Sequence, residues 1–198
     1  MKRFLFVLSS LVLILGAVMV VTANAGTYTF TPTPADLWDL EHQYYYRWGI
    51  NWTVPSGETI DSATLTYYNI YNWVVEERDN LYTHLLDSAA AVVSRSWDGE
   101  GGGDNFDGQG VLLGVWDDPN GGSPSGYNLS YPIDSANYDY LGDGNFGFGI
   151  DPDCHYYNNG ITFTIETTTA QAPEPATMFL LGSGLLGLAG YVRRKFGK

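Results

Sequence analysis

The chain has 198 residues and a formal net charge of −13 at pH 7, with 22 acidic residues against nine lysines and arginines. Between residues 26 and 172 there is no lysine, and three arginines face 21 acids, so this segment has a formal net charge of −18. Such a surface repels phosphate backbones and excludes nucleic acid as a partner. The single cysteine, Cys154, excludes an intramolecular disulfide framework.

The first 25 residues have the pattern of a secretory signal peptide. Lys2 and Arg3 precede an uncharged apolar stretch at residues 4–21, and the small-x-small sequence Ala-Asn-Ala follows at residues 23–25. We therefore expect a signal helix, export, and cleavage after Ala25. The alternative, a membrane-spanning anchor, lacks a charged stop-transfer flank after the apolar stretch.

Residues 26–172 have a size that suits one domain with its own core. Runs rich in Thr and aromatic residues alternate with clusters of Gly, Pro, Asn and Asp, which is typical of strands and turns. The expected strands are Gly26–Thr31, Gln43–Trp52, Ala63–Val74, Asn80–Asp87, Val92–Trp97, Val111–Trp116, Tyr127–Ile133, Asn145–Ile150 and Gly160–Thr168. Residues 35–43 come nearest to a helical pattern, with room for one turn. The pattern predicts an all-β fold, an antiparallel β-sandwich of jelly-roll type.

The last two expected strands look like the two arms of a hairpin. Ile161, Phe163 and Ile165 alternate with polar residues, and the strand at 145–150 alternates large apolar residues with glycines. We expect these strands to pair across the nine-residue loop 151–159. Earlier in the chain, GETIDSATLTYY at residues 57–68 resembles a strand of exported carbohydrate-binding-module-like jelly rolls, which implies the same fold class.

A first acidic cluster lies in the glycine-rich segment 97–110. It contains Asp98, Glu100, Asp104, Asn105 and Asp107 among six glycines. Glycines let a loop fold back so that several oxygens converge on one calcium ion, although the EF-hand spacing is absent. The alternative is a mobile, solvated loop.

A second acidic cluster surrounds the expected strand 145–150. Asp143 precedes this strand while Asp151 and Asp153 follow it, so a separation of roughly 17 Å keeps the two sides from sharing an ion. A metal at Asp151 and Asp153 needs ligands from another loop, either Asp117 and Asp118 or the first cluster. The predicted calcium ligands are Asp98, Asp104, Asp107, Asp151 and Asp153.

No motif in the chain specifies an enzyme. Cys154 and His155 are adjacent, but neighbouring side chains of an extended segment point in opposite directions, so we expect Cys154 to be a buried small side chain or half of an intermolecular bridge. The three histidines, His42, His84 and His155, lack zinc-ligand spacing. We predict a non-catalytic protein, and the alternative is a glycan-active hydrolase that uses two of the many carboxylates.

Aromatic residues gather at residues 42–52 and 67–73, where Tyr or Trp occupies both faces of an expected strand. One face has the core to fill, and the other is free to stack on sugar rings. The alternative is that sheets simply favour aromatic residues. The pattern therefore leaves polysaccharide binding and a purely structural role open.

The end of the chain combines three short features in order. Pro173, Glu174 and Pro175 precede 17 uncharged, mostly apolar residues at 176–192, and a basic cluster begins at Arg193. The apolar stretch lies at the short limit for a transmembrane helix. The basic residues would stay in the cytoplasm and leave the acidic domain outside.

This order of features resembles the PEP-CTERM sorting signal of Gram-negative bacteria, over about 26 of the 198 residues. The resemblance implies recognition of Pro173, Glu174 and Pro175 by an exosortase, which removes the tail. It also implies use of the export machinery, transient tethering to the inner membrane, and delivery to the cell surface or to an exopolysaccharide matrix. The expected organisation is a signal peptide at 1–25, an acidic β-sandwich at 26–172 and a sorting segment at 173–198.

Overall fold

The computed structural model describes residues 26–76, 79–99, 102–169 and 175–196, and the predicted signal peptide at 1–25 lies outside them. The chain divides into two compact units, one at Ala25–Thr168 and one that contains helix α3 (Pro175–Phe196). Each unit is described by itself below.

The described part of the first unit has ten strands. They are β1 (Gly26–Phe30), β2 (Tyr44–Ile50), β3 (Glu58–Asn72), β4 (Asn80–Leu86), β5 (Val93–Trp97), β6 (Val111–Asp117), β7 (Tyr127–Pro132), β8 (Phe146–Pro152), β9 (Tyr156–Tyr157) and β10 (Ile161–Thr169). All nine predicted strands are present. Only the two-residue β9 was not predicted, and β3 begins five residues earlier than expected.

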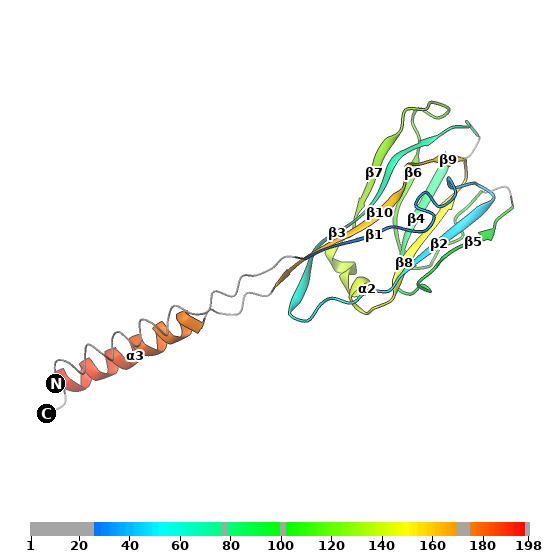
Figure 1. Cartoon of the computed structure of the whole chain (residues 1–198). Coiled ribbons are helices and arrows are strands. Elements are labelled where there is room, and N and C mark those ends of the chain that lie inside the picture. Colours follow the sequence, from blue (N-terminus) through cyan, green and yellow to red (C-terminus); the bar gives the residue numbers. More distant parts are fainter. Residues whose placement is uncertain (1–25, 77–78, 100–101, 170–174, 197–198) are drawn as a thin grey trace. The chain divides into compact units, whose positions relative to one another are not determined.

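The strands form two sheets (Figure 1). One has the order β1-β10-β3-β7, with β9 beside one end of β3, and the other has the order β5-β2-β8-β4-β6. Every described strand pair is antiparallel. With β5 and β9 set aside, each sheet has four strands, and successive strands alternate between the sheets except for β4 and β6, which pair within one sheet. This is the order of a jelly roll. The prediction of an all-β, antiparallel fold is confirmed.

The predicted hairpin between residues 145–150 and 160–168 is wrong. Strand β8 pairs with β2 and β4, whereas β10 lies in the other sheet and pairs with β1. The connecting segment crosses from one sheet to the other instead of turning back within one. Alternation had shown correctly which side chains face inward, but it carries no information about the neighbouring strand.

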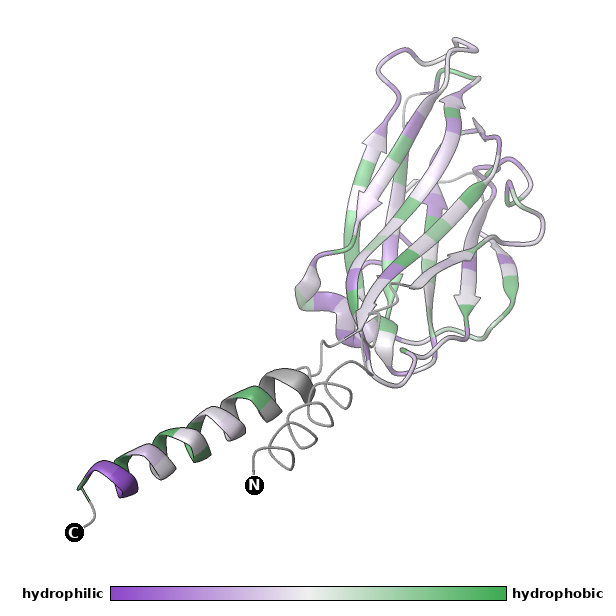
Figure 2. Ribbon diagram, turned by 60° about the vertical axis from the view of Figure 1, so that its left-hand side comes forward, coloured by the Kyte–Doolittle hydropathy of each residue, from purple (hydrophilic) through white to green (hydrophobic). Residues whose placement is uncertain are grey.

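The core lies between the two sheets. In β10, Ile161, Phe163 and Ile165 are fully buried while Glu166 is exposed, as the alternation predicted. Across the interface, the ring centroids of Phe148 in β8 and Phe163 lie 4.9 Å apart. Figure 2 shows the resulting alternation of hydrophobic and hydrophilic residues along the strands.

The sheet that contains β8 is also covered on its outer face, because all seven residues of β8 are buried. A Cβ atom added to Gly149 would lie 2.6 Å from the Phe106 ring, and one added to Gly147 would lie 2.6 Å from Ala89. The glycines of β8 thus make room for two covering segments. One of them is the glycine-rich loop, which the buried Phe106 anchors on the sheet, in contrast to the solvated-loop alternative.

The single helical turn expected at 35–43 takes a different form. Residues 37–40 all have positive φ angles, between 43° and 57°, so this turn is left-handed. Left-handed backbone is costly for residues with a Cβ atom. Burial of Leu37 and Leu40, both 0% exposed, compensates for this conformational cost, because it fixes the turn against the core.

Two short helical segments, η1 (Ser135–Asn137) and α2 (Tyr138–Gly142), connect β7 to β8 and were not predicted. The side chain of Asp134 accepts a hydrogen bond from the Ala136 N–H and so caps the first of them.

The second unit contributes helix α3, at the position predicted for the helix of the sorting segment. Its last turn contains Arg193, Arg194 and Lys195, which interact favourably with the negative end of the helix dipole. Among the described residues, no helix has the combination of length and apolarity that crossing a membrane requires. The helix is therefore observed, while a membrane-spanning role for it stays a prediction.

Candidate functional sites

The two acidic clusters meet in the fold. The backbone N–H groups of Gly102 and Gly103 donate to Asp153 Oδ1 over 2.9 and 3.2 Å. Asn105 donates from its backbone and side-chain nitrogens to Asp151 Oδ2 over 2.6 and 3.1 Å. The sequence required a second loop beside Asp151 and Asp153, and the glycine-rich loop lies there. It presents amide N–H donors to the carboxylate oxygens of Asp151 and Asp153.

Asp151 lies at the centre of this arrangement and is 0% exposed. Burial raises the pKa of its carboxyl group to about 7, and the nearby charges of Asp98 and Asp153 raise it further, while the hydrogen bonds from Asn105 act in the opposite direction. Its Oδ1 atom is buried and has no hydrogen-bond partner among the described residues. A buried carboxyl with one unpaired oxygen fits a protonated acid or an ion ligand.

The other predicted calcium ligands have different surroundings. Asp104 Oδ2 lies 2.8 Å from His84 Nε2, and Asp104 Oδ1 accepts a hydrogen bond from the Phe106 N–H. Asp107 is exposed, and Asp98 is half-buried close to Asp151. Asp118 is occupied elsewhere, since it accepts a bond from the Asn72 N–H.

A second constellation was not predicted from the sequence. Among the described residues, His42, Glu76 and His155 are the only group of three or more His, Cys, Asp or Glu residues whose donor atoms lie close enough together to share an ion. These three residues are called the histidine cluster below. His42 Nδ1 lies 2.9 Å from Glu76 Oε2, and His155 Nδ1 lies 3.8 Å from Glu76 Oε1. The ring centroids of the histidines are 4.1 Å apart.

Three loops bring the cluster together: the turn before β2, the segment after β3 and the segment after β8. Backbone hydrogen bonds fix them to one another. The Trp73 N–H donates to the His155 carbonyl over 3.3 Å, and the Tyr156 N–H donates to the Leu40 carbonyl over 3.4 Å. The positions of both histidines are therefore set by the ends of paired strands.

Cys154 supports the same junction. Its thiol is 0% exposed and donates to Asn72 Oδ1 over 3.3 Å and to the Val74 carbonyl over 3.1 Å. Burial raises the pKa of this thiol well above its usual value, which disfavours the nucleophilic thiolate. This geometry agrees with one of the two roles that the sequence predicts for Cys154, that of a buried small side chain.

Spacing along the chain could not reveal the histidine cluster, because its members are 34 and 79 residues apart. The information needed to predict the cluster lies in which strands pair with one another. Strands β2 and β8 are antiparallel neighbours with Tyr46 opposite Ile150, so the residues before β2 lie beside those after β8. The incorrect pairing of β8 with β10 concealed this proximity.

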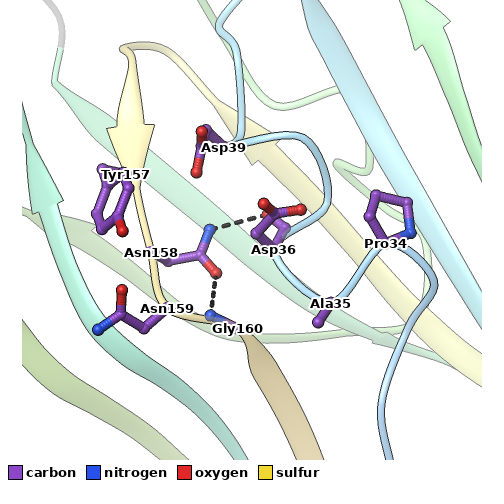
Figure 3. A pocket seen from close by; sticks show the side chains of 8 residues that line it. All are labelled: Pro34, Ala35, Asp36, Asp39, Tyr157, Asn158, Asn159 and Gly160. Carbon is purple, nitrogen blue, oxygen red and sulfur yellow. Dashed lines mark hydrogen bonds between the residues drawn. The ribbon is translucent and has the colours of Figure 1, made fainter.

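A polar pocket of about 300 Å³ lies beside the left-handed turn (Figure 3). Its walls come from two segments, residues 34–39 and residues 157–160. Asn158 joins them, because its side-chain amide donates to the Asp36 carbonyl and accepts from the Gly160 N–H, both over 2.9 Å. Burial, and secondarily the charge of Asp36, raises the pKa of Asp39.

An exposed aromatic surface lies at the β5 edge and is called the Trp97 patch. It consists of Trp38, Tyr44, Arg95 and Trp97. The Arg95 guanidinium lies 4.7 Å from the Trp38 ring centroid and 4.5 Å from that of Tyr44. Trp97 is 65% exposed and packs edge-on against Tyr44. By contrast, Tyr46 and Trp48 of the same predicted aromatic run are buried in the core.

These observations define the class: an acidic antiparallel β-domain followed by a separate helix that ends in basic residues. Comparison with known families adds that residues 171–195 match the model of the PEP-CTERM protein-sorting motif. This match confirms the resemblance seen in the sequence and supports an exported precursor that an exosortase sorts to the cell surface. Pro173 and Glu174 lie outside the described residues. A search of curated proteins found no significant match to the chain.

Proposed function

We propose that the chain is an exported surface or matrix protein, sorted by exosortase in a Gram-negative bacterium, whose β-domain acts without catalysis. The observation that carries the proposal is the PEP-CTERM match at residues 171–195. Helix α3, which begins at Pro175, and its terminal basic residues agree with a segment that holds a precursor at the inner membrane until it is cleaved.

Replacement of Pro173, Glu174 and Pro175 by alanine tests the sorting step in the native host. We expect the wild-type protein to lose its tail and reach the surface, and the triple variant to stay full-length in the membrane fraction. Mass spectrometry of the C-terminus measures the processing. Thr168→Ala, a change just before the segment, is the control, and normal processing of the triple variant would contradict the proposal.

We further propose that the β-domain binds polysaccharide through the Trp97 patch. Trp97 exposes most of its surface, and a neighbouring arginine held between two rings adds hydrogen-bond donors for sugar hydroxyls. A planar aromatic surface next to fixed donors suits stacking against a sugar ring.

Trp97→Ala tests this role. Loss of one stacking side chain is expected to weaken glycan-array binding by roughly tenfold, equivalent to about 1.4 kcal/mol. Tyr68→Ala is a matched control, because Tyr68 is 41% exposed and lies on β3 in the other sheet. A blank array would favour a purely structural role, and release of cleaved sugar would favour the hydrolase alternative.

Calcium binding by the acidic loops is a subsidiary proposal. It is supported by the net charge of −18 between residues 26 and 172 and by the unpaired, buried Asp151 Oδ1. Millimolar calcium is expected to raise Tm and a chelator to reverse the shift, with Asp151→Asn reducing the response. A melting curve that calcium leaves unchanged would end this proposal.

A further inference from the structure

The histidine cluster has the donor set of a transition-metal site. It offers two imidazole nitrogens and a carboxylate, the ligand types that zinc and its neighbours prefer, whereas calcium selects oxygen. The side chains of His42, Glu76 and His155 are 13%, 29% and 18% exposed, so they are shielded yet reachable by an ion. This site is separate from the acidic loops proposed for calcium.

An unpaired nitrogen is the second, independent observation. His155 Nδ1 is buried and has no hydrogen-bond partner among the described residues, and it faces Glu76 Oε1 at 3.8 Å. A buried polar atom without a partner is costly. Two ligands of one tetrahedral zinc ion, each about 2.0–2.1 Å from the metal, hold their donor atoms about 3.2–3.5 Å apart. The separation at His155 therefore needs only a small adjustment to bind an ion.

The other nitrogen of His155 is already prepared for such a role. His155 Nε2 lies 3.1 Å from Glu41 Oε2. A carboxylate that accepts the N–H of a metal-binding histidine fixes its tautomer and leaves the second nitrogen free to bind metal. Glu41 is thus a positioning residue, while Trp73 packs edge-on against the His155 ring at 5.1 Å between centroids.

Ion pairing alone is the competing explanation. The contacts His42–Glu76 and His155–Glu41 satisfy one nitrogen of each ring, at 2.9 and 3.1 Å. They leave His155 Nδ1 without a hydrogen bond, 3.8 Å from Glu76 Oε1, and they do not explain why two imidazole rings pack at 4.1 Å. A shared cation accounts for both features.

We propose that His42, Glu76 and His155 bind one divalent transition-metal ion of the zinc class, with Glu41 orienting His155. Because the ligands come from three loops, the ion cross-links the connections before β2, after β3 and after β8. An exported domain with one cysteine has no intramolecular disulfide, and this metal site provides an equivalent link at one end of the sandwich.

The test uses the full chain in mild detergent, stripped of metal and then titrated with Zn²⁺. We expect one retained Zn²⁺ per chain by elemental analysis, and a Tm increase of about 5–10 °C at 100 times Kd. Co²⁺ in place of Zn²⁺ is expected to give the visible absorption of a tetrahedral nitrogen–oxygen site. Failure of the wild-type chain to retain Zn²⁺ would overturn the proposal.

Variants assign the ligands. His42→Gln, Glu76→Gln and His155→Gln are each expected to abolish stoichiometric retention, whereas Glu41→Gln is expected to weaken affinity by about 10–100-fold while keeping the Co²⁺ spectrum. Glu166→Gln is the matched control, since Glu166 is an exposed carboxylate on β10. Wild-type affinity in both histidine variants would contradict the assignment.

A measurement on the wild type covers the case in which a ligand variant does not fold. The chain has three histidines, so their ring resonances can be assigned by NMR. Zn²⁺ is expected to shift the nitrogen signals of His42 and His155 and to leave those of His84 unchanged, because His84 bonds to Gln109 and Asp104 instead. Unchanged signals from His42 and His155 would refute the site.

Discussion

A single carboxyl group, that of Asp151, is expected to make the stability of the β-domain depend on pH. Its pKa is about 7 in the folded chain against 3.8 for an ordinary Asp. The folded state therefore holds a proton that the unfolded state releases between these values. The resulting stabilisation is complete below about pH 4. It decreases by about 1.4 kcal/mol per pH unit between the two pKa values and is lost once the pH has risen through 7.

Asp151→Asn should therefore reduce the fall in Tm between pH 5 and pH 8, because the amide keeps a neutral group at this position. Thermal melts across this range measure the slope, with the exposed Asp139→Asn as the control. Saturating calcium should also flatten the slope if it binds the ionised carboxylate. Identical slopes in Asp151→Asn and the wild type would disprove the assignment of the pKa.

Gly49 is a residue that tolerates no side chain. A Cβ atom there would lie 1.8 Å from the carbonyl oxygen of Ala90, which is backbone and cannot rotate away. Gly49→Ala is expected to cost about 3 kcal/mol or more, or to prevent folding. Gly142→Ala is the matched control, because its Cβ atom would make an ordinary 3.6 Å contact with Val54. Chemical denaturation compares the two, and equal stability would show that the covering segment can move.

At the level of the elements, a hydrogen bond between two buried hydroxyl groups joins the two sheets through the core. Tyr67 on β3 and Thr83 on β4 place their hydroxyl oxygens 3.0 Å apart, and both residues are 0% exposed. Tyr67→Phe is expected to lower the free energy of unfolding by about 1–2 kcal/mol, since it leaves a buried hydroxyl unpaired. A double-mutant cycle with Thr83→Val isolates the coupling, and additive effects would exclude a direct interaction.

The elements themselves were largely predictable from the sequence. Thr and aromatic runs between turn residues located nine strands, and alternation in β10 identified its buried face. The pairing of β8 was not predictable, because a strand buried on both faces shows no polar side from which its sheet could be inferred. Strand β9 is too short to have a pattern, and residues 58–62 at the start of β3 are mostly polar.

At the scale of the whole molecule, net charge is the property that can be predicted most directly from the sequence. With a net charge of −18 between residues 26 and 172, the folded domain repels itself, and screening should stabilise it. We expect Tm to rise between 10 and 300 mM NaCl. Calcium chloride at equal ionic strength provides the comparison, since a larger rise indicates specific binding. A Tm that falls with salt would mean that local ion pairs outweigh the repulsion.

The candidate sites were harder to predict from the sequence than the strands were, because they depend on which segments the fold brings together. Composition marks the acidic loops, and their contact through Asp151 and Asp153 is one of the two options that the sequence leaves open. The histidine cluster required the correct neighbours of β2 and β8. The sorting segment was recognisable because its features are contiguous in the chain and need no fold to bring them together.

The scarcity of basic residues has a consequence for survival outside the cell. Trypsin-like proteases cleave after Lys or Arg, and between residues 26 and 172 only Arg47, Arg78 and Arg95 meet that requirement. Arg47 lies within β2, which is paired on both sides, and the Arg95 side chain is held between two aromatic rings. Proteases need an extended, detached segment, so the folded domain offers them few points of attack. Its composition therefore limits the positions at which trypsin-like proteases can cleave the domain.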